Sequence, residues 1–144
     1  MKKFVTIVVL VIILLVGGAW WSKSLQSNDP NIISKNGIHW HPELTILIKG
    51  EKQTIPQNIG IGPQYPSNMT PVHTHDDATE GIIHLEFEGV VRKKDITLGQ
   101  FFGIWGKDIN SFGSNVKMTV NELENNELLN YVMHDKDKII LNYE

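Results

Sequence analysis

The chain has 144 residues, of which 13 are basic and 16 are acidic, for a formal charge of −3, and it contains no cysteine. This length is enough for one domain of ordinary size and too short for two full domains. The lack of cysteine excludes disulfides and thiolate metal ligands, and the acidic balance argues against nucleic-acid binding, which needs clustered Lys and Arg.

The first segment, residues 1–21, is predicted to be a transmembrane anchor. Two lysines precede about eighteen nearly uncharged residues at positions 4–21, which would span roughly 27 Å of the ~30 Å hydrocarbon layer. Two bulky tryptophans follow the small residues at 17–19, so we favour an uncleaved anchor over a cleaved signal sequence. Lys2 and Lys3 should stay cytoplasmic, which places the rest of the chain on the outer face of a cell membrane.

A polar tether, residues 22–37, is expected to join the anchor to an extracytoplasmic domain, residues 38–144. Setting the anchor aside removes Lys2 and Lys3 from the 13 basic residues and leaves 11 basic and 16 acidic residues, a formal charge of −5. Such a surface suits solubility and the attraction of cations.

The domain is predicted to begin with a β-hairpin. Residues 43–49 are rich in aliphatic and β-branched side chains, and residues 49–52 offer a tight turn into residues 53–55. Residues 56–70 hold three prolines and two glycines, which predicts an ordered surface loop without a regular element.

Period-two alternation predicts a third strand over residues 81–87. Its core face would carry Ile83, Leu85 and Phe87, and its other face Ile82, His84 and Glu86. A short helix is expected after Thr97 and ends at Gly106, because Leu98, Phe101, Phe102 and Trp105 form one apolar stripe. Residues 116–120 and 138–143 are predicted to be the last two strands.

These elements predict an α+β fold, in which the transmembrane helix is followed by a small mixed sheet packed against one short helix. The last part has a Val-x-Val strand, a polar crossover containing Tyr131, a Lys-Asp-Lys turn and a terminal aliphatic strand. It resembles the closing half of a β-grasp (ubiquitin-like) domain over about 30 residues.

Histidines carry the main functional signal. Five of the six lie between positions 39 and 84, as two His-x-His doublets and one further residue: His39, His41, His73, His75 and His84. In an extended chain both imidazoles of such a doublet point to the same face. A single strand imidazole is usually a surface or hydrogen-bonded residue, but this clustering predicts that the doublets meet in one pocket and that at least three rings converge on a cation. His134 lies in a solvated turn and is left out.

The ligand types select the metal. Neutral imidazole suits copper, zinc, nickel and ferrous iron, whereas calcium and magnesium prefer oxygen ligands. Three or four imidazoles without thiolate fit Cu(II) or Zn(II), with copper first by the Irving–Williams order, and the missing cysteine excludes a blue-copper site. We expect Asp76 and Glu86 to be ligands or to accept the other ring N–H. Asp77 and Glu80 are expected to be solvated loop residues.

One resemblance concerns His73, His75 and the following Glu80, which are similar to the first metal motif of the cupins. There a His-x-His pair and a Glu hold iron, manganese or nickel, so the resemblance implies a metal-dependent enzyme. The glycine frame of that motif is not matched, and too few strands remain for a double-stranded β-helix.

A broader resemblance rests on the anchor and on five segments: residues 38–43 (Ile-His-Trp-His-Pro-Glu), 58–62 (Asn-Ile-Gly-Ile-Gly), 73–76 (His-Thr-His-Asp), 81–86 (Gly-Ile-Ile-His-Leu-Glu) and 98–102 (Leu-Gly-Gln-Phe-Phe). With these the chain resembles a family of membrane-anchored, His-rich envelope proteins of archaea and bacteria. Some members carry a thiol–disulfide isomerase label, whose chemistry a chain without cysteine cannot perform. The resemblance implies a single envelope domain and no particular mechanism.

The leading functional hypothesis is therefore a membrane-tethered domain that coordinates Cu(II) or Zn(II) for metal capture, delivery or sensing. A second hypothesis is a His-ligated metalloenzyme, a cupin-like oxygenase or a hydrolase, with an open metal position and Glu86 or Asp76 as base. A third is a structural or partner-binding subunit of a membrane complex, with Trp40, Phe102 and Trp105 as core or interface aromatics.

Overall fold

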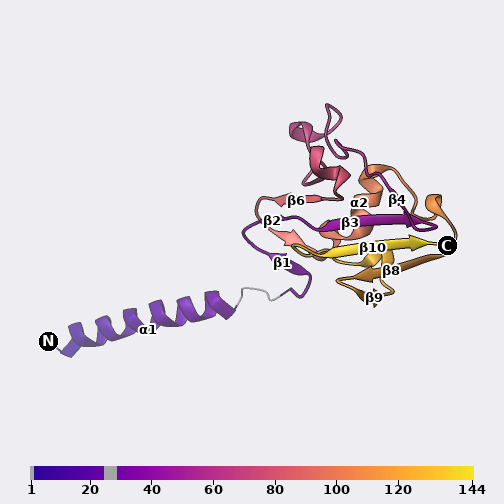
Figure 1. Cartoon of the computed structure of the whole chain (residues 1–144). Coiled ribbons are helices and arrows are strands. Elements are labelled where there is room, and N and C mark those ends of the chain that lie inside the picture. The colour runs from indigo at the N-terminus through magenta and orange to yellow at the C-terminus, as the bar shows by residue number, and fades with distance from the viewer. Residues whose placement is uncertain (1, 25–28) are drawn as a thin grey trace. The chain divides into compact units, whose positions relative to one another are not determined.

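The computed structural model describes residues 2–24 and 29–144, and the chain divides into two compact units, Met1–Pro30 and Asn31–Glu144. The described part of the first unit holds one helix, α1 (Lys2–Ser24), drawn in indigo in Figure 1. Its segment Phe4–Ser22 has 19 residues and, as predicted, is long and apolar enough to cross a membrane, a property that signal sequences share.

The second unit is α+β, as predicted, and its largest sheet has five strands in the order β4-β3-β10-β8-β9 (Figure 1). These strands are β3 (Glu43–Ile48), β4 (Glu51–Gln53), β8 (Val116–Val120), β9 (Leu123–Asn125) and β10 (Lys138–Tyr143). β10 runs parallel to β3 and antiparallel to β8, so the sheet is mixed. The predicted hairpin is confirmed, and its turn residues Lys49 and Gly50 have positive φ angles of 51° and 85°, which favours strand reversal.

The predicted short helix is also confirmed as α2 (Leu98–Trp105). Its N-cap is Thr97, whose side chain accepts a 3.1 Å hydrogen bond from the backbone N–H of Gln100. Gly106 ends the helix in the left-handed conformation that glycine adopts without a steric penalty. The buried side chains of α2 share one hydrophobic core with those of β3, β8 and β10: Leu98, Phe101, Phe102, Leu44, Ile46, Met118, Ile139 and Leu141.

A second sheet has three antiparallel strands, β2 (Ile38–Trp40), β6 (His84–Phe87) and β5 (Val72–His73), with β6 in the centre. This sheet is joined to the large one just before β6. The backbone N–H of Leu44 donates to the carbonyl of Gly81 at 2.8 Å. Gly81 has a φ of +102°, and a Cβ there would run into the Leu44 carbonyl, so glycine is required at this junction.

The remaining elements are a two-stranded sheet and five 3₁₀ helices. The sheet pairs β1 (Ile32–Ser34) with β7 (Val91–Arg92). The 3₁₀ helices are η1 (Pro66–Asn68), η2 (Asp76–Thr79), η3 (Lys93–Ile96), η4 (Ile109–Phe112) and η5 (Leu128–Asn130).

The structure differs from the sequence-based expectation in four ways. The loop at residues 56–70, expected to have no regular element, contains the 3₁₀ helix η1. The domain has three sheets rather than one, because short strands too brief to show a periodic pattern form additional pairs. Strand β6 is shorter than the expected strand at 81–87, since residues 81–83 bridge toward β3 instead. β1 lies within the segment expected to be a tether, residues 22–37.

Candidate metal centre

Strand register places the candidate ligands on one face of the three-stranded sheet. His73 of β5 lies opposite His84 of β6, and His39 of β2 lies opposite Glu86 of β6. Directly opposed side chains on antiparallel strands have Cβ atoms about 4.5–5.5 Å apart. His84 and Glu86 are two positions apart and therefore share a face. The central strand thus supplies one partner to each His-x-His doublet.

Buried apolar side chains on the opposite face of this sheet fix the register of its strands. Ile83 and Leu85 are fully buried in the hydrophobic core, as the alternation of residues 82–87 predicted, and Val72 of β5 lies opposite Leu85. A shift of one residue would expose these side chains and bury the polar ones. Apolar burial on one face therefore holds the imidazoles in line on the other.

The five imidazoles form a continuous series. The ring centroids of His39 and His41 are 4.8 Å apart, and those of His41 and His84 are also 4.8 Å apart. His84 and His75 follow at 4.7 Å, and His75 and His73 at 4.7 Å. His84 is thus the member at which the two doublets meet. The rings do not form one equidistant cluster but divide into two groups of possible ligands.

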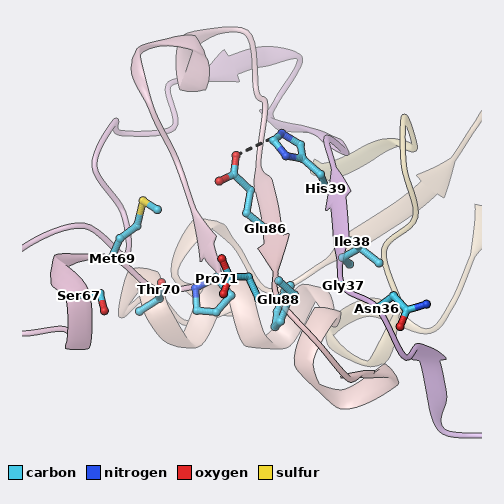
Figure 2. A pocket seen from close by; sticks show the side chains of 11 residues that line it. Asn36, Gly37, Ile38, His39, Ser67, Met69, Thr70, Pro71, Glu86 and Glu88 are labelled. Atoms are coloured by element: carbon cyan, nitrogen blue, oxygen red, sulfur yellow. Dashed lines mark ion pairs between the residues drawn. The ribbon is translucent and has the colours of Figure 1, made fainter.

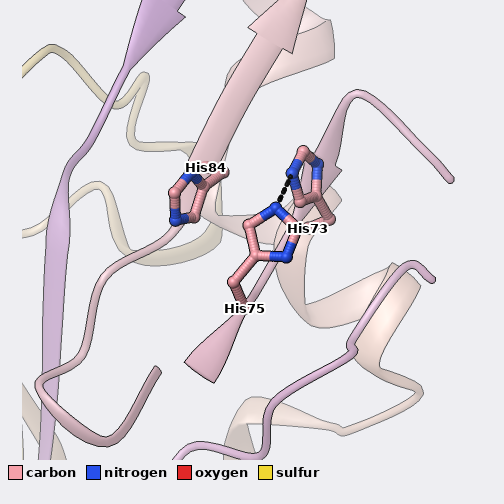
Figure 3. Close-up of side chains that lie close together, drawn as sticks. All are labelled: His73, His75 and His84. Carbon is pink, nitrogen blue, oxygen red and sulfur yellow. Dashed lines mark hydrogen bonds between the residues drawn. The ribbon is translucent and has the colours of Figure 1, made fainter. Parts of the chain in front are cut away.

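The first set is His73, His75 and His84, which we name the inner group (Figure 3). One possible ligand nitrogen from each lies within 4.8 Å of the others. His73 is fully buried, and the His84 side chain is 12% exposed. The Nε2 atoms of His73 and His75 are 3.1 Å apart. Two nitrogens bound to one ion at about 2.05 Å would be about 2.9 Å apart at a right angle and about 3.3 Å apart in a tetrahedron, so this spacing suits a shared cation.

Hydrogen bonds behind the inner group set which ring nitrogen is free to bind. His73 Nδ1 lies 2.8 Å from the carbonyl oxygen of Thr70 and must donate to it, which leaves the lone pair on Nε2. His84 Nε2 lies 3.0 and 3.2 Å from the two carboxylate oxygens of Asp77 and donates there. His84 Nδ1 is buried and, among the described residues, has no hydrogen-bond partner. Carbonyl and carboxylate groups orient metal-binding imidazoles in this way.

Thr74, the residue between the inner doublet, holds the backbone in place. Its hydroxyl donates to the carbonyl of Pro56 at 2.9 Å and accepts from the backbone N–H of Ile59 at 3.0 Å. Thr74 is fully buried on the side of the strand away from the rings. Thr74 thereby links the doublet to the loop at residues 56–60. The sequence alone does not indicate this role, because Thr74 appears there only as the residue between two histidines.

The second set is His39, His41 and Glu86, which we name the outer group, and one possible ligand atom from each again lies within 4.8 Å of the others. His39 Nε2 is 3.4 Å from Glu86 Oε1, and the two side chains are 66% and 31% exposed. The backbone N–H of His41 donates to Asp135 Oδ1 at 2.9 Å, which fixes the end of the doublet. His39 and Glu86 line a hollow of about 820 Å³ (Figure 2).

Electrostatics favour the neutral form of one ring in each group, His73 in the inner group and His41 in the outer group. Burial lowers the pKa of His73, and the nearby His75 lowers it further, while the hydrogen bond to Thr70 opposes this. Burial also lowers the pKa of His41, and the neighbouring His84 and His39 add to the effect. Neutral imidazole is the form that binds a metal ion.

Other residues singled out from the sequence lie apart from the rings. Asp76 is exposed, and within the described chain no hydrogen bond or ion pair joins it to an imidazole, whereas Asp77, expected to be a solvated loop residue, contacts His84. Glu80 is exposed at the end of η2. His134 lies outside both groups, and its ring contacts Trp40 at a centroid distance of 5.9 Å.

Comparison with known protein families, with characterised proteins and with solved structures found no match to this chain.

Proposed function

We propose that the chain is a membrane-tethered domain that binds a transition-metal ion at the inner group, for metal capture, delivery or sensing. One observation supports this most strongly. Two of the three imidazoles, His73 and His84, donate one N–H to a fixed acceptor, so in the neutral ring the other nitrogen carries the lone pair that can bind an ion. A buried nitrogen without a hydrogen bond, such as His84 Nδ1 among the described residues, is costly, and a bound cation would remove that cost.

The proposed ion is Cu(II) or Zn(II). The inner group offers only nitrogen, and the chain has no cysteine, so hard oxygen-seeking ions such as Ca²⁺ and Mg²⁺ are poor fits. Copper is the stronger competitor by intrinsic affinity, and zinc is the ion that three imidazoles commonly hold with one position left for water.

The membrane part of the proposal rests on α1 and on charge. An apolar segment of this length and hydropathy, preceded by Lys2 and Lys3, would keep its N-terminus in the cytoplasm and put the metal domain on the outer face. Protease added to intact cells should then remove the domain. A domain that becomes cleavable only after lysis would contradict this orientation.

We also infer a β-grasp-like fold for the five-stranded sheet. Its first and last strands in the sequence, β3 and β10, form a parallel central pair. On the outer sides β3 pairs with its hairpin partner β4, and β10 pairs with the antiparallel strand β8. Helix α2 comes between the hairpin and β8. Amide–amide contacts between Leu44 and Ile139 and between Ile46 and Leu141 in NMR spectra would test the central pairing.

Metal titration of the full chain in detergent micelles tests the function. The protein must carry no polyhistidine tag and must be stripped with chelator before Cu(II) or Zn(II) is added. His75→Ala, at a half-buried ligand, should weaken binding at the inner group by at least about 100-fold, because loss of a group behind a ligand already costs about 10–100-fold.

The matched control is His134→Ala, which removes the one histidine outside both groups and should bind as the unchanged chain does. Equal uptake by the His75→Ala variant and the unchanged chain would contradict the proposal. Elemental analysis of the protein taken from its own membrane would then identify the physiological metal.

A metalloenzyme is the second candidate, and the hollow beside His39 and Glu86 favours it. An ion with an open position there would activate water or polarise a carbonyl. Metal-dependent hydrolysis of an activated ester, lost in Glu86→Gln and kept in His134→Ala, is the expected signature of this alternative.

A further inference from the structure

The outer group has the composition of a metal site in its own right. It offers two imidazoles and one carboxylate, a ligand set that zinc takes in hydrolytic enzymes and that ferrous iron takes in oxygenases. Strand pairing and one backbone hydrogen bond hold these three residues in place. His39 and Glu86 are register partners across β2 and β6, and the backbone of His41 is pinned by Asp135.

The inner group is less exposed to solvent than the outer group. Side-chain exposure falls from 66% at His39 through 31% at Glu86 to 12% at His84, and His73 is fully buried. The outer group also borders the hollow of about 820 Å³, so an ion there would keep coordination positions open toward solvent (Figure 2). Open positions and exposed ligands allow water to exchange at the ion.

The groups are in direct contact. Glu86 Oε1 lies 3.4 Å from His39 Nε2 in the outer group and 3.4 Å from His84 Nδ1 in the inner group. The rings of His41 and His84 are 4.8 Å apart and meet edge to face. One carboxylate and one ring contact therefore join the two sets of ligands.

We propose that the outer group is a second binding site for a divalent transition-metal ion, adjacent to the inner one, weaker than it and faster to exchange with solvent. This proposal rests on metal binding at the inner group. It deepens that function by making the domain a two-ion centre, in which the exposed site receives ions at the surface and the buried site retains them.

The test uses the untagged full chain in detergent micelles, stripped of metal, with Zn(II) to count ions and Cu(II) as a spectroscopic probe. Calorimetric titration should give two Zn(II) ions per chain, the second bound more weakly. His39→Ala combined with His41→Ala should bind one ion with an affinity close to that of the tighter site. His134→Ala should still bind two.

Adjacency has its own readout. Two Cu(II) ions held in neighbouring sites couple magnetically, so the half-field signal in electron paramagnetic resonance should appear with the second equivalent. It should be absent from the His39→Ala and His41→Ala double variant at any copper ratio. Two uncoupled copper signals in the unchanged chain would overturn the proposal.

The possible failures are distinguishable. If the unchanged chain and the double variant both bind one ion with equal affinity, the outer group is only a surface ion pair, and the inner-group function stands. If the unchanged chain binds no ion, both proposals fall. If the double variant loses its only ion, the assignment of the tight site to the inner group is wrong.

Discussion

The inner and outer groups start from the same His-x-His pattern and end with different properties. In the inner doublet His73 ends strand β5, is buried and is hydrogen-bonded to Thr70, whereas in the outer doublet His39 lies in the middle of strand β2 and is largely exposed to solvent. The partner on β6 also differs, since it is His84 for one doublet and Glu86 for the other. The His-x-His pattern alone does not define a ligand set, because the third candidate ligand comes from the neighbouring strand β6.

The largest expected effect comes from His84→Ala, since His84 belongs to the inner group and contacts the outer one. We expect inner-site affinity to fall by at least about 100-fold, because both a ligand and its contact with Asp77 are lost. Calorimetric titration measures this, with far-UV circular dichroism to verify folding. His84→Gln keeps a polar side chain at the position, and unchanged affinity in both variants would remove His84 from the site.

The next largest effect should distinguish the neighbouring carboxylates Asp77 and Asp76 by their influence on metal affinity. Asp77→Asn should weaken the inner site by about 10–100-fold, because the charged acceptor behind His84 is lost, and should leave the outer site unchanged. Asp76→Asn is the matched control, since it removes the same charge one residue earlier on an exposed side chain. Equal losses from both substitutions would mean that net charge, and not the contact to His84, supports the site.

A smaller effect is expected from Glu86→Gln, which acts mainly on the outer group. Gln keeps an oxygen ligand and loses only the charge, so the second ion should be weakened by about 10-fold, and the tighter one less, because Glu86 lies 3.4 Å from His84 Nδ1 and is not a member of the inner group. Glu88→Gln removes a charge from the same hollow without touching a ring and should bind two ions normally. A larger loss at the tighter site would reverse the assignment of Glu86.

The smallest effect concerns pH and the metal-free protein. The folded-state pKa values of His73 and His41 lie below the ordinary 6.5, so below that pH the unfolded chain binds more protons than the folded one. The free energy of unfolding should therefore fall as the pH is lowered from 6.5, by at most about 1.4 kcal/mol per pH unit for each group. Urea denaturation in chelator checks this. A free energy of unfolding that rises on acidification would contradict it, and His41→Gln should flatten the slope.

Longer elements were predictable because their signals are local. The alternation at residues 82–87 identified the buried face of Ile83 and Leu85, and the cap at Thr97 with its apolar stripe identified α2. Short strands such as β5 and β9 were missed, since two or three residues carry no measurable period. β5 exists only through its pairing with β6 across a loop, and β9 through a tight hairpin with β8 at Asn121 and Glu122.

For the candidate site, the sequence indicated the imidazoles but not how they divide. Assigning Glu86 to His39 requires the register of β2 on β6, which no local pattern contains. The contact of Asp77, rather than Asp76, with His84 depends on the 3₁₀ turn of η2, whose rotation decides which carboxylate faces the ring. Thr70 was overlooked because it acts through its carbonyl, which every residue type possesses.

Strand β6 has a consequence for how this domain can change. His84 and Glu86 lie on the face of β6 that carries the imidazoles, whereas Leu85 is buried on the opposite, core-facing side. Packing of Leu85 therefore sets the register of the candidate ligands. We expect a substitution that loosens packing at Leu85 to let β6 shift in register, so that both candidate ligand sets lose their partners together. Redesign of either candidate ligand set therefore has to begin with the core side chains on the opposite face of β6.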